Sequence, residues 1–133
     1  MRKILVLFAH PKFEQSDVNQ ALINQIQKLE HVHIRDLYEL YPDFHIDIQA
    51  EQEVLFQHEV IIWHHPIYWY SCPPLLKQWI DLVLEFGWAY GPGGVFLKNK
   101  FVMNVVTSGG SEEVYSPQGR NRYTMEEFLR PFE

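Results

Sequence analysis

The sequence has little cysteine, few basic residues and no long hydrophobic segment. Cys72 is the single cysteine among 133 residues, which excludes a disulfide framework and leads us to expect a reducing, cytoplasmic location. The longest apolar runs, residues 4–9 and 60–63, are far shorter than the ~20 residues that a membrane-spanning helix needs. Arg2 and Lys3 precede the first run, but no small-residue cleavage site follows it, so the pattern does not match a signal peptide.

The charge balance is acidic, with 11 Lys and Arg residues against 17 Asp and Glu residues and a net charge of −6. This balance argues against nucleic acid and against anionic membrane surfaces as partners. Hydrophobic residues make up 47% of the chain, which predicts one globular domain over residues 1–133. Aromatic residues make up 15%, which favours a flat ligand, an oligomer contact or simply a large core.

Apolar segments alternate with helical patterns along the chain. Three of the expected strands are almost continuously apolar, as strands covered on both faces are, and one shorter strand alternates. The expected strands are residues 3–9, 32–35, 60–65 and 101–107, and the expected helices are residues 19–29, 47–57, 73–86 and 124–129. This order predicts an α/β fold with a parallel sheet and helices on both faces.

Three loops follow the carboxyl ends of these strands, where parallel sheets bind their ligands. The first, residues 10–18, leads into a helix and lacks the glycines of a P-loop or a dinucleotide fingerprint. A helix amino end offers N–H donors to an anion, and Ser16, Asn19 and His10 add side-chain donors. The loop is therefore either a phosphate site or an ordinary helix start capped by Ser16 or Asp17.

The second loop, residues 65–72, concentrates aromatic rings beside a proline. It predicts a wall for a planar ligand, with backbone groups free to bind the ligand's edge, or a hydrophobic oligomer contact. Ser71 is expected to cap the following helix. No base accompanies Cys72, so we interpret this residue as structural rather than nucleophilic.

The third loop, residues 107–122, follows a buried strand and contains Gly109 and Gly110, which let the backbone approach a ligand closely. Tyr115 can donate a proton or a hydrogen bond to charge that develops on a ring, unless the segment is only a flexible turn. The glycines within residues 91–94 follow a helix and are interpreted as a turn. The seven histidines show no metal-site spacing, so we expect no metal.

In their order and spacing these residues resemble the flavodoxin-like NAD(P)H quinone oxidoreductase family over essentially the whole chain. The most specific segments are His10 with Ser16-x-x-Asn19, residues 65–70 with 73–77 behind them, residues 88–91, and residues 107–110 with Tyr115. Within that family, residues 37–48 and 121–133 look most like the ancillary subunits of glutathione-regulated potassium efflux systems.

The resemblance implies a flavodoxin-like three-layer sandwich with strand order 2-1-3-4 and a non-covalent flavin, FMN or FAD, in a homodimer. It assigns the phosphate to His10, Ser16, Val18 and Asn19, the ring wall to Pro66, Ile67, Tyr68, Trp69 and Tyr70, and the pyrimidine side to Thr107, Ser108, Gly109 and Gly110. Tyr115 would lie over the reduced ring, and Tyr90 would border the substrate pocket from across the dimer.

The implied chemistry is a ping-pong reaction in which NAD(P)H delivers hydride to the flavin and a quinone or similar planar acceptor takes two electrons. The resemblance also implies an alternative function. The chain would bind and activate a glutathione-gated potassium efflux transporter at the inner face of the membrane, with or without turnover of its own.

Two features depart from the family pattern. Asn121 stands where the quinone reductases have a histidine of the proton relay. An amide can donate a hydrogen bond but is no general acid near neutral pH. We therefore expect Tyr115 and Asn121 as the catalytic residues, with Tyr115 as the proton donor and a slow turnover. The chain also ends at Glu133, where relatives continue through another strand and helices. We therefore expect a C-terminally truncated domain that lacks the last strand and helix of the usual five-stranded fold and has an open sheet edge. Such a domain would either depend on a dimer partner or bind flavin poorly, and a flavin-free relic of the family is the third hypothesis.

Overall fold

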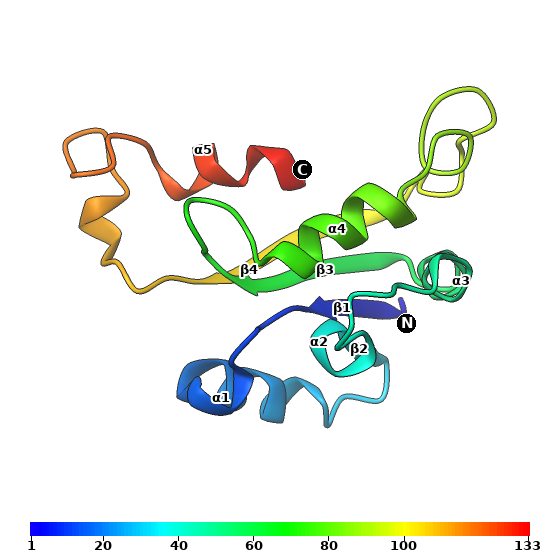
Figure 1. Cartoon of the computed structure of the whole chain (residues 1–133), viewed down its shortest axis with the longest axis horizontal. Coiled ribbons are helices and arrows are strands. Elements are labelled where there is room, and N and C mark those ends of the chain that lie inside the picture. The colour runs from blue at the N-terminus through cyan, green and yellow to red at the C-terminus, as the bar shows by residue number, and fades with distance from the viewer.

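The four strands of the chain form one parallel sheet in the order β2-β1-β3-β4, as predicted. A computed structural model describes all residues, 1–133 (Figure 1). The strands are β1 (Ile4–Phe8), β2 (Val32–Asp36), β3 (Val60–Pro66) and β4 (Phe101–Thr107). Each lies within two residues of its expected bounds, because a buried apolar run is a strong strand signal.

Helices cover both faces of this sheet. They are α1 (Asp17–Ile26), α2 (Leu37–Leu40), α3 (Ile48–Phe56), α4 (Pro74–Val83) and α5 (Met125–Leu129), with short 3₁₀ turns η1 (Phe13–Gln15), η2 (Glu112–Val114) and η3 (Arg130–Phe132). The four-residue α2 and the 3₁₀ turns were not predicted. In Figure 1, α1 lies below the sheet and α4 and α5 lie above it.

Alternating residues of the central strand supply the two cores. Leu5 and Leu7 face the larger core with α3 and α4, where Leu75 and Trp79 are fully buried. Phe8 faces the smaller core under α1, together with Val6 and Ile23. Full burial of each such side chain contributes about 2 kcal/mol, so the α4 stripe anchors the helix that follows the second loop.

The helix starts explain where the expected boundaries shift. Ser16 caps α1 by accepting the Asn19 N–H, so the helix begins at Asp17, two residues earlier than expected. The prediction that Ser71 caps α4 is wrong. The cap position belongs to Pro73, and Pro74 occupies the first helical position, where a missing N–H costs nothing.

A buried carboxylate joins three elements on the α3 side of the sheet. Glu51 of α3 is fully buried and pairs with the Arg35 guanidinium of β2. It also accepts hydrogen bonds from the Tyr41 hydroxyl and from Trp79 Nε1, the latter at 3.0 Å. Two N–H groups of Arg35, together with one donor each from Tyr41 and Trp79, thus compensate the desolvation of the carboxylate and fix β2, the α2–α3 connection and α4 around α3.

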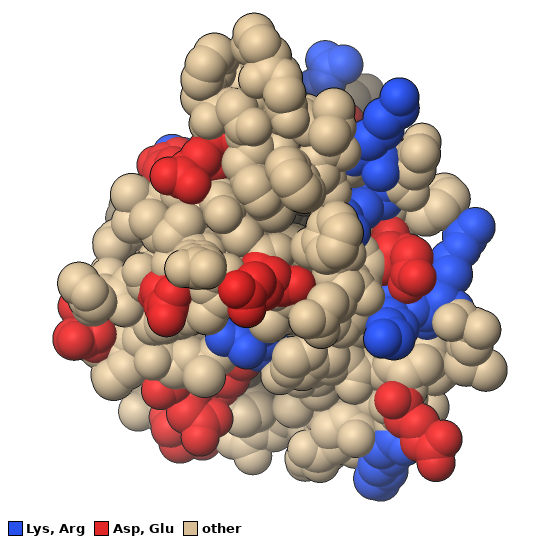
Figure 2. Space-filling view, turned by 90° about the vertical axis from the view of Figure 1, so that its right-hand side faces the viewer, with Lys and Arg blue, Asp and Glu red and all other residues tan.

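Residues 84–100 project from the end of α4 at the amino ends of the strands (Figure 1). Trp88 stacks on Phe96 with ring centroids 5.3 Å apart, and Phe86 packs against Tyr90. Figure 2 views this side of the molecule. Acidic side chains gather mainly in the left part of the view, basic ones mainly in the right part, and much of the upper part is uncharged.

Strand β4 forms one edge of the sheet, and its first half is only partly covered. Phe101, Val102 and Met103 each keep about half of their surface exposed.

None of the helices combines the length and the apolar character needed to cross a membrane.

Candidate functional site

The carboxyl ends of β1, β3 and β4 lie next to one another and bring the three predicted loops together (Figure 1). In the first loop, His10 Nδ1 accepts the Lys12 N–H at 3.1 Å, and burial lowers the pKa of His10. Ser16 Oγ accepts from both the backbone N–H and the side-chain amide of Asn19. The hydroxyl proton of Ser16 therefore remains available to a ligand.

Asn19 lies beneath this loop rather than on its surface, and it is almost fully buried. Its Nδ2 donates to Ser16 Oγ at 2.8 Å and to Thr107 Oγ1 at 3.2 Å. Its Oδ1 faces His64 Nε2 at 3.0 Å. Because all three polar hydrogen-bonding positions have internal partners, the Asn19 side chain joins the loops and does not face a ligand.

The aromatic loop turns back on itself at Trp69 and Tyr70. Tyr68 and Ser71 exchange two backbone hydrogen bonds, and both residues between them have positive φ, 48° and 61°. This is the backbone of a tight hairpin turn that normally takes Asn-Gly. Two large aromatic residues hold it at a conformational cost, and Trp69 is 93% exposed.

The third loop carries Tyr115 back toward β4. Ser108 Oγ donates to the Tyr115 hydroxyl at 3.1 Å and accepts the Gly110 N–H at 3.1 Å. A Cβ on Gly110 would come within 2.9 Å of Val114 and 3.1 Å of Tyr115, so this close approach requires glycine. A Cβ on Gly109 would meet nothing within 4 Å, which leaves open space above its backbone.

Helix α5 contributes a residue that the sequence analysis missed. Phe128 stacks on Tyr70 with centroids 5.1 Å apart and meets Tyr115 edge-on at 6.0 Å. The Tyr70 hydroxyl donates to Asn121 Oδ1 at 3.3 Å. Phe128 and Asn121 thus connect the second and third loops. The apolar position of Phe128 in an expected helix was the only signal for it.

His64 was missed as well, because a strand histidine is most often a core residue. It is 2% exposed on the α1 face of β3, and its ring packs against Phe8 with centroids 5.0 Å apart. Burial and the neighbouring histidines lower its pKa to about 4. The ring is therefore neutral near pH 7 and donates one N–H.

Tyr90 lies in the projecting segment at the opposite end of the sheet from the three loops (Figure 1). Within one chain the structure does not bring it to the site. Cys72 is buried, and burial raises the pKa of its thiol, which agrees with the structural interpretation. The chain contains no group of three or more His, Cys, Asp or Glu residues that could hold a metal ion.

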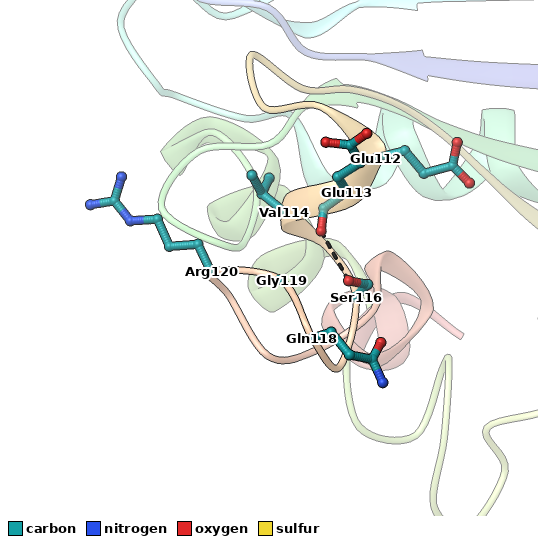
Figure 3. A pocket seen from close by; sticks show the side chains of 7 residues that line it. All are labelled: Glu112, Glu113, Val114, Ser116, Gln118, Gly119 and Arg120. Carbon is teal, nitrogen blue, oxygen red and sulfur yellow. Dashed lines mark hydrogen bonds between the residues drawn. The ribbon is translucent and has the colours of Figure 1, made fainter.

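Two hollows flank the third loop. One, of about 590 Å³, lies on the side of the strand ends and is lined by Val106, Ser108, Gly110, Glu112, Tyr115, Thr124, Met125 and Glu126. The other, of about 650 Å³, lies at residues 112–120 (Figure 3). There the Arg120 side chain points away from Glu112 and Glu113, so the charged groups do not converge on one ligand. The first hollow adjoins the predicted site residues.

Free backbone donors surround the three loops. The N–H groups of Asp17 and Val18 precede the first intrahelical bonds of α1, and those of Trp69, Tyr70 and Gly109 find no acceptor within the chain. A rim of donors beside aromatic rings, with a helix amino end at one side, suits a planar ligand that carries a phosphate. The residues present therefore fit a flavin.

Known proteins are similar to this chain in sequence and in fold. The family described as a flavodoxin-like fold matches residues 2–133. The glutathione-regulated potassium-efflux system ancillary protein KefG of Yersinia enterocolitica is 50% identical over 131 residues, which make up 98% of this chain and 71% of that protein.

Two solved structures are also similar. General stress protein 14 of Treponema denticola, in complex with FMN, is 39% identical with a TM-score of 0.95 and matches 98% of this chain and 75% of that one. An NADPH-quinone reductase from P. pentosaceus is 30% identical with a TM-score of 0.89 and matches 98% and 74%.

Proposed function

The chain belongs to the family with the flavodoxin-like fold, and on this premise we propose that it binds a flavin and catalyses two-electron transfer from NAD(P)H to a quinone. The observation that carries the proposal is the meeting of three loops, with their free N–H groups and aromatic turn, at one sheet edge. The likeness to an FMN complex and to an NADPH-quinone reductase supports it. Residues 1–133 would form one flavin-binding domain.

The first loop would hold the phosphate. The amino end of α1 presents the free Val18 N–H and the favourable end of the helix dipole. Ser16 adds its hydroxyl proton, and His10 lies at the end of β1. Asn19 would act by fixing Ser16. This donor set also suits the first phosphate of FAD, so FMN and FAD are both proposed ligands.

The second and third loops would hold the ring. Pro66, Ile67, Tyr68, Trp69 and Tyr70 would wall it, and Thr107, Ser108, Gly109 and Gly110 would line its pyrimidine side. When bound, the flavin supplies the hydride chemistry. The protein stabilises negative charge there through backbone N–H groups, and Tyr115, held by Ser108, supplies a hydroxyl at the edge of the site.

A homodimer would complete the substrate pocket. Tyr90 belongs to the segment between α4 and β4 at the amino ends of the strands, opposite the three loops, so we propose that it reaches the loops of a second copy. Nicotinamide and quinone would then bind in turn between Tyr90 and the wall of aromatic rings. The position of Asn121, bonded to Tyr70, leaves Tyr115 as the proposed proton donor.

The test is the visible absorption spectrum of the purified chain after incubation with FMN or FAD and exhaustive dialysis. We expect a retained flavin band, shifted by the protein and bleached by NAD(P)H. A chain that is folded by circular dichroism and retains no flavin would overturn the proposal. A retained band that NAD(P)H does not bleach would support binding and contradict the oxidoreductase activity.

A second function is favoured by the 50% identity to KefG. We propose as the alternative that the chain binds a glutathione-gated potassium efflux transporter at the membrane and activates it. The test compares potassium efflux from cells that carry the transporter with the native chain, with its Tyr115→Phe variant or with neither. Activation that survives the loss of turnover would support a regulatory subunit, and no activation by either chain would contradict it.

A further inference from the structure

Three hydrogen bonds converge on the buried Asn19 side chain, and each reaches a different part of the site. One partner is Ser16 at the start of α1, the second is Thr107 at the end of β4, and the third is His64 within β3. The bond to Thr107 spans 88 residues of sequence. Asn19 is thus the point at which the proposed phosphate loop is joined to the strand end beside the ring.

The Asn19 amide has a donor end and an acceptor end, and its orientation decides whether the hydroxyls of Ser16 and Thr107 accept or donate toward the interior. Asn19 Nδ2 carries both N–H donors and gives one to Ser16 Oγ and one to Thr107 Oγ1. Both hydroxyl oxygens therefore act as acceptors toward the interior. Their own protons are left to donate outward, in the direction a phosphate or a ring oxygen requires. A flipped amide would present Oδ1 to the hydroxyls and draw those protons inward.

The tautomer of His64 selects between these two orientations. Its Nε2 lies 3.0 Å from Asn19 Oδ1, and the neutral tautomer that carries its proton on Nε2 donates to this oxygen. In that tautomer, a flip of the amide would place the Asn19 N–H groups against the N–H of His64 and leave buried donors unpaired, which is costly. The depressed pKa of His64 agrees with a neutral ring.

We propose that His64 is a positioning residue of the flavin site. It fixes the Asn19 amide so that the hydroxyls of Ser16 and Thr107 both act as donors to the ligand. This inference rests on the proposed flavin-binding function. His64 itself touches no ligand, because Asn19 stands between it and the loop.

The test compares two variants of the apo-chain, His64→Leu and His64→Gln. Leucine removes the donor, whereas the glutamine amide can present an N–H to Asn19 Oδ1. Dissociation constants for FMN and for riboflavin are measured by flavin fluorescence. We expect His64→Leu to weaken FMN binding about tenfold, and riboflavin binding less, because riboflavin has no phosphate for Ser16. His64→Gln should restore most of the FMN affinity.

A double-variant cycle separates positioning from general damage. In a Ser16→Ala chain one of the two directed hydroxyls is already missing, so His64→Leu should cost FMN affinity less than it does in the native chain. His64→Leu would overturn the inference if it lowered the affinities for FMN and riboflavin equally, if its effect were additive with that of Ser16→Ala, and if glutamine restored neither affinity. Such a result would show that His64 only supports the fold. Native affinity in His64→Leu would overturn it as well.

A readout without flavin keeps this inference separate from the proposed function. The side-chain NH₂ resonances of Asn19, followed by NMR in the apo-chain, report the orientation and protection of the amide. We expect them to shift and to exchange faster in His64→Leu and to return in His64→Gln. If the native chain binds no flavin, the proposed function fails. Unchanged Asn19 resonances in His64→Leu would then contradict the positioning role on their own.

Discussion

At the scale of single residues, the buried His64 of β3 makes the stability of the chain depend on pH. Burial lowers the pKa of His64 from 6.5 to about 4, so the folded state disfavours the charged ring. The stabilisation is present above pH 6.5, the value of the unfolded chain, and is lost as the pH falls toward 4. We expect the free energy of unfolding to fall by about 3 kcal/mol across this range on account of His64.

The measurement is denaturant unfolding of the native chain and of His64→Gln at several pH values between 7 and 4. Glutamine does not titrate, so the slope of the free energy of unfolding against pH should differ most between the two chains from pH 6.5 to 4. His65 is also buried, and burial lowers its pKa too, so some acid sensitivity remains in the variant. Parallel curves for the two chains would contradict the assignment of the pKa shift to His64.

The site residues show how far single positions can be interpreted from sequence. His10, Ser16, Thr107 and Tyr115 lie at or beyond the carboxyl ends of the strands, so their gathering followed from the predicted sheet. The internal contacts of Asn19 could not be predicted, because its partner His64 lies 45 residues away and no local pattern links the two. A polar side chain within a buried strand was the only available signal.

At the scale of elements, the turn at Trp69 and Tyr70 places two aromatic side chains in a backbone conformation that destabilises the fold. Both residues have positive φ, a region that costs most residues about 1 kcal/mol and costs asparagine and glycine less. We expect the double variant Trp69→Asn, Tyr70→Gly to relieve that strain. The Tyr70 ring also packs on Phe128, so the net gain in the free energy of unfolding should be about 1 kcal/mol.

The same variant should bind flavin more weakly, because the proposed ring wall is gone. Unfolding by denaturant and FMN titration of one preparation measure both effects, and Trp69→Asn alone is the matched control that keeps the Tyr70–Phe128 stack. A variant that is both less stable and tighter in flavin binding would contradict this account. No sequence pattern predicted the turn, since Trp-Tyr is not a turn signal.

The Glu51 cluster allows a second prediction at this scale. Burial and the hydrogen bond to Glu51 raise the pKa of Tyr41 to about 12. The hydroxyl is stabilised in its neutral form, so this stabilisation is complete below pH 10 and is lost as the pH rises through 12. We expect at most about 2 kcal/mol of stability to disappear over that interval, because solvent screens part of the effect of the shift.

Tyr41→Phe is the comparison, because it keeps the ring and removes the proton. Unfolding free energies of the two chains should converge as the pH rises from 9 to 12, whereas other tyrosines and lysines affect both chains alike. A difference that stays constant with pH would contradict the Tyr41–Glu51 bond. The sequence placed Glu51 in an expected helix, but it gave no indication that a charged residue there is fully buried.

At the scale of the whole molecule, the two ends of the sheet carry complementary parts of the proposed site. The loops with Tyr115 lie at the carboxyl ends of the strands, and the exposed aromatic segment with Tyr90 lies at the amino ends. The alternation of apolar runs and helices predicted the parallel sheet, and the family resemblance supplied the order of its strands, but no sequence pattern gave the separation of these two tyrosines within one chain. If the pocket needs both, it must form between two chains.

This arrangement predicts complementation between two defective chains. Tyr115→Phe and Tyr90→Ala should each form dimers with low quinone reductase activity. A heterodimer of the two would contain one pocket with both native tyrosines and one with neither. If subunits exchange at random, an equal mixture should recover about a quarter of the native activity, since half of the dimers are mixed and each of these has one intact pocket.

The activity is measured before and after the two variants are mixed, with dimers confirmed by light scattering and flavin content checked in each sample. Recovery should require subunit exchange, so a mixture assayed before exchange gives the background. A mixture that never exceeds the mean of its two components, although heterodimers form, would place both tyrosines in one chain's pocket or exclude Tyr90 from it. The sheet separates them within one chain, and that separation makes recovery the expected result.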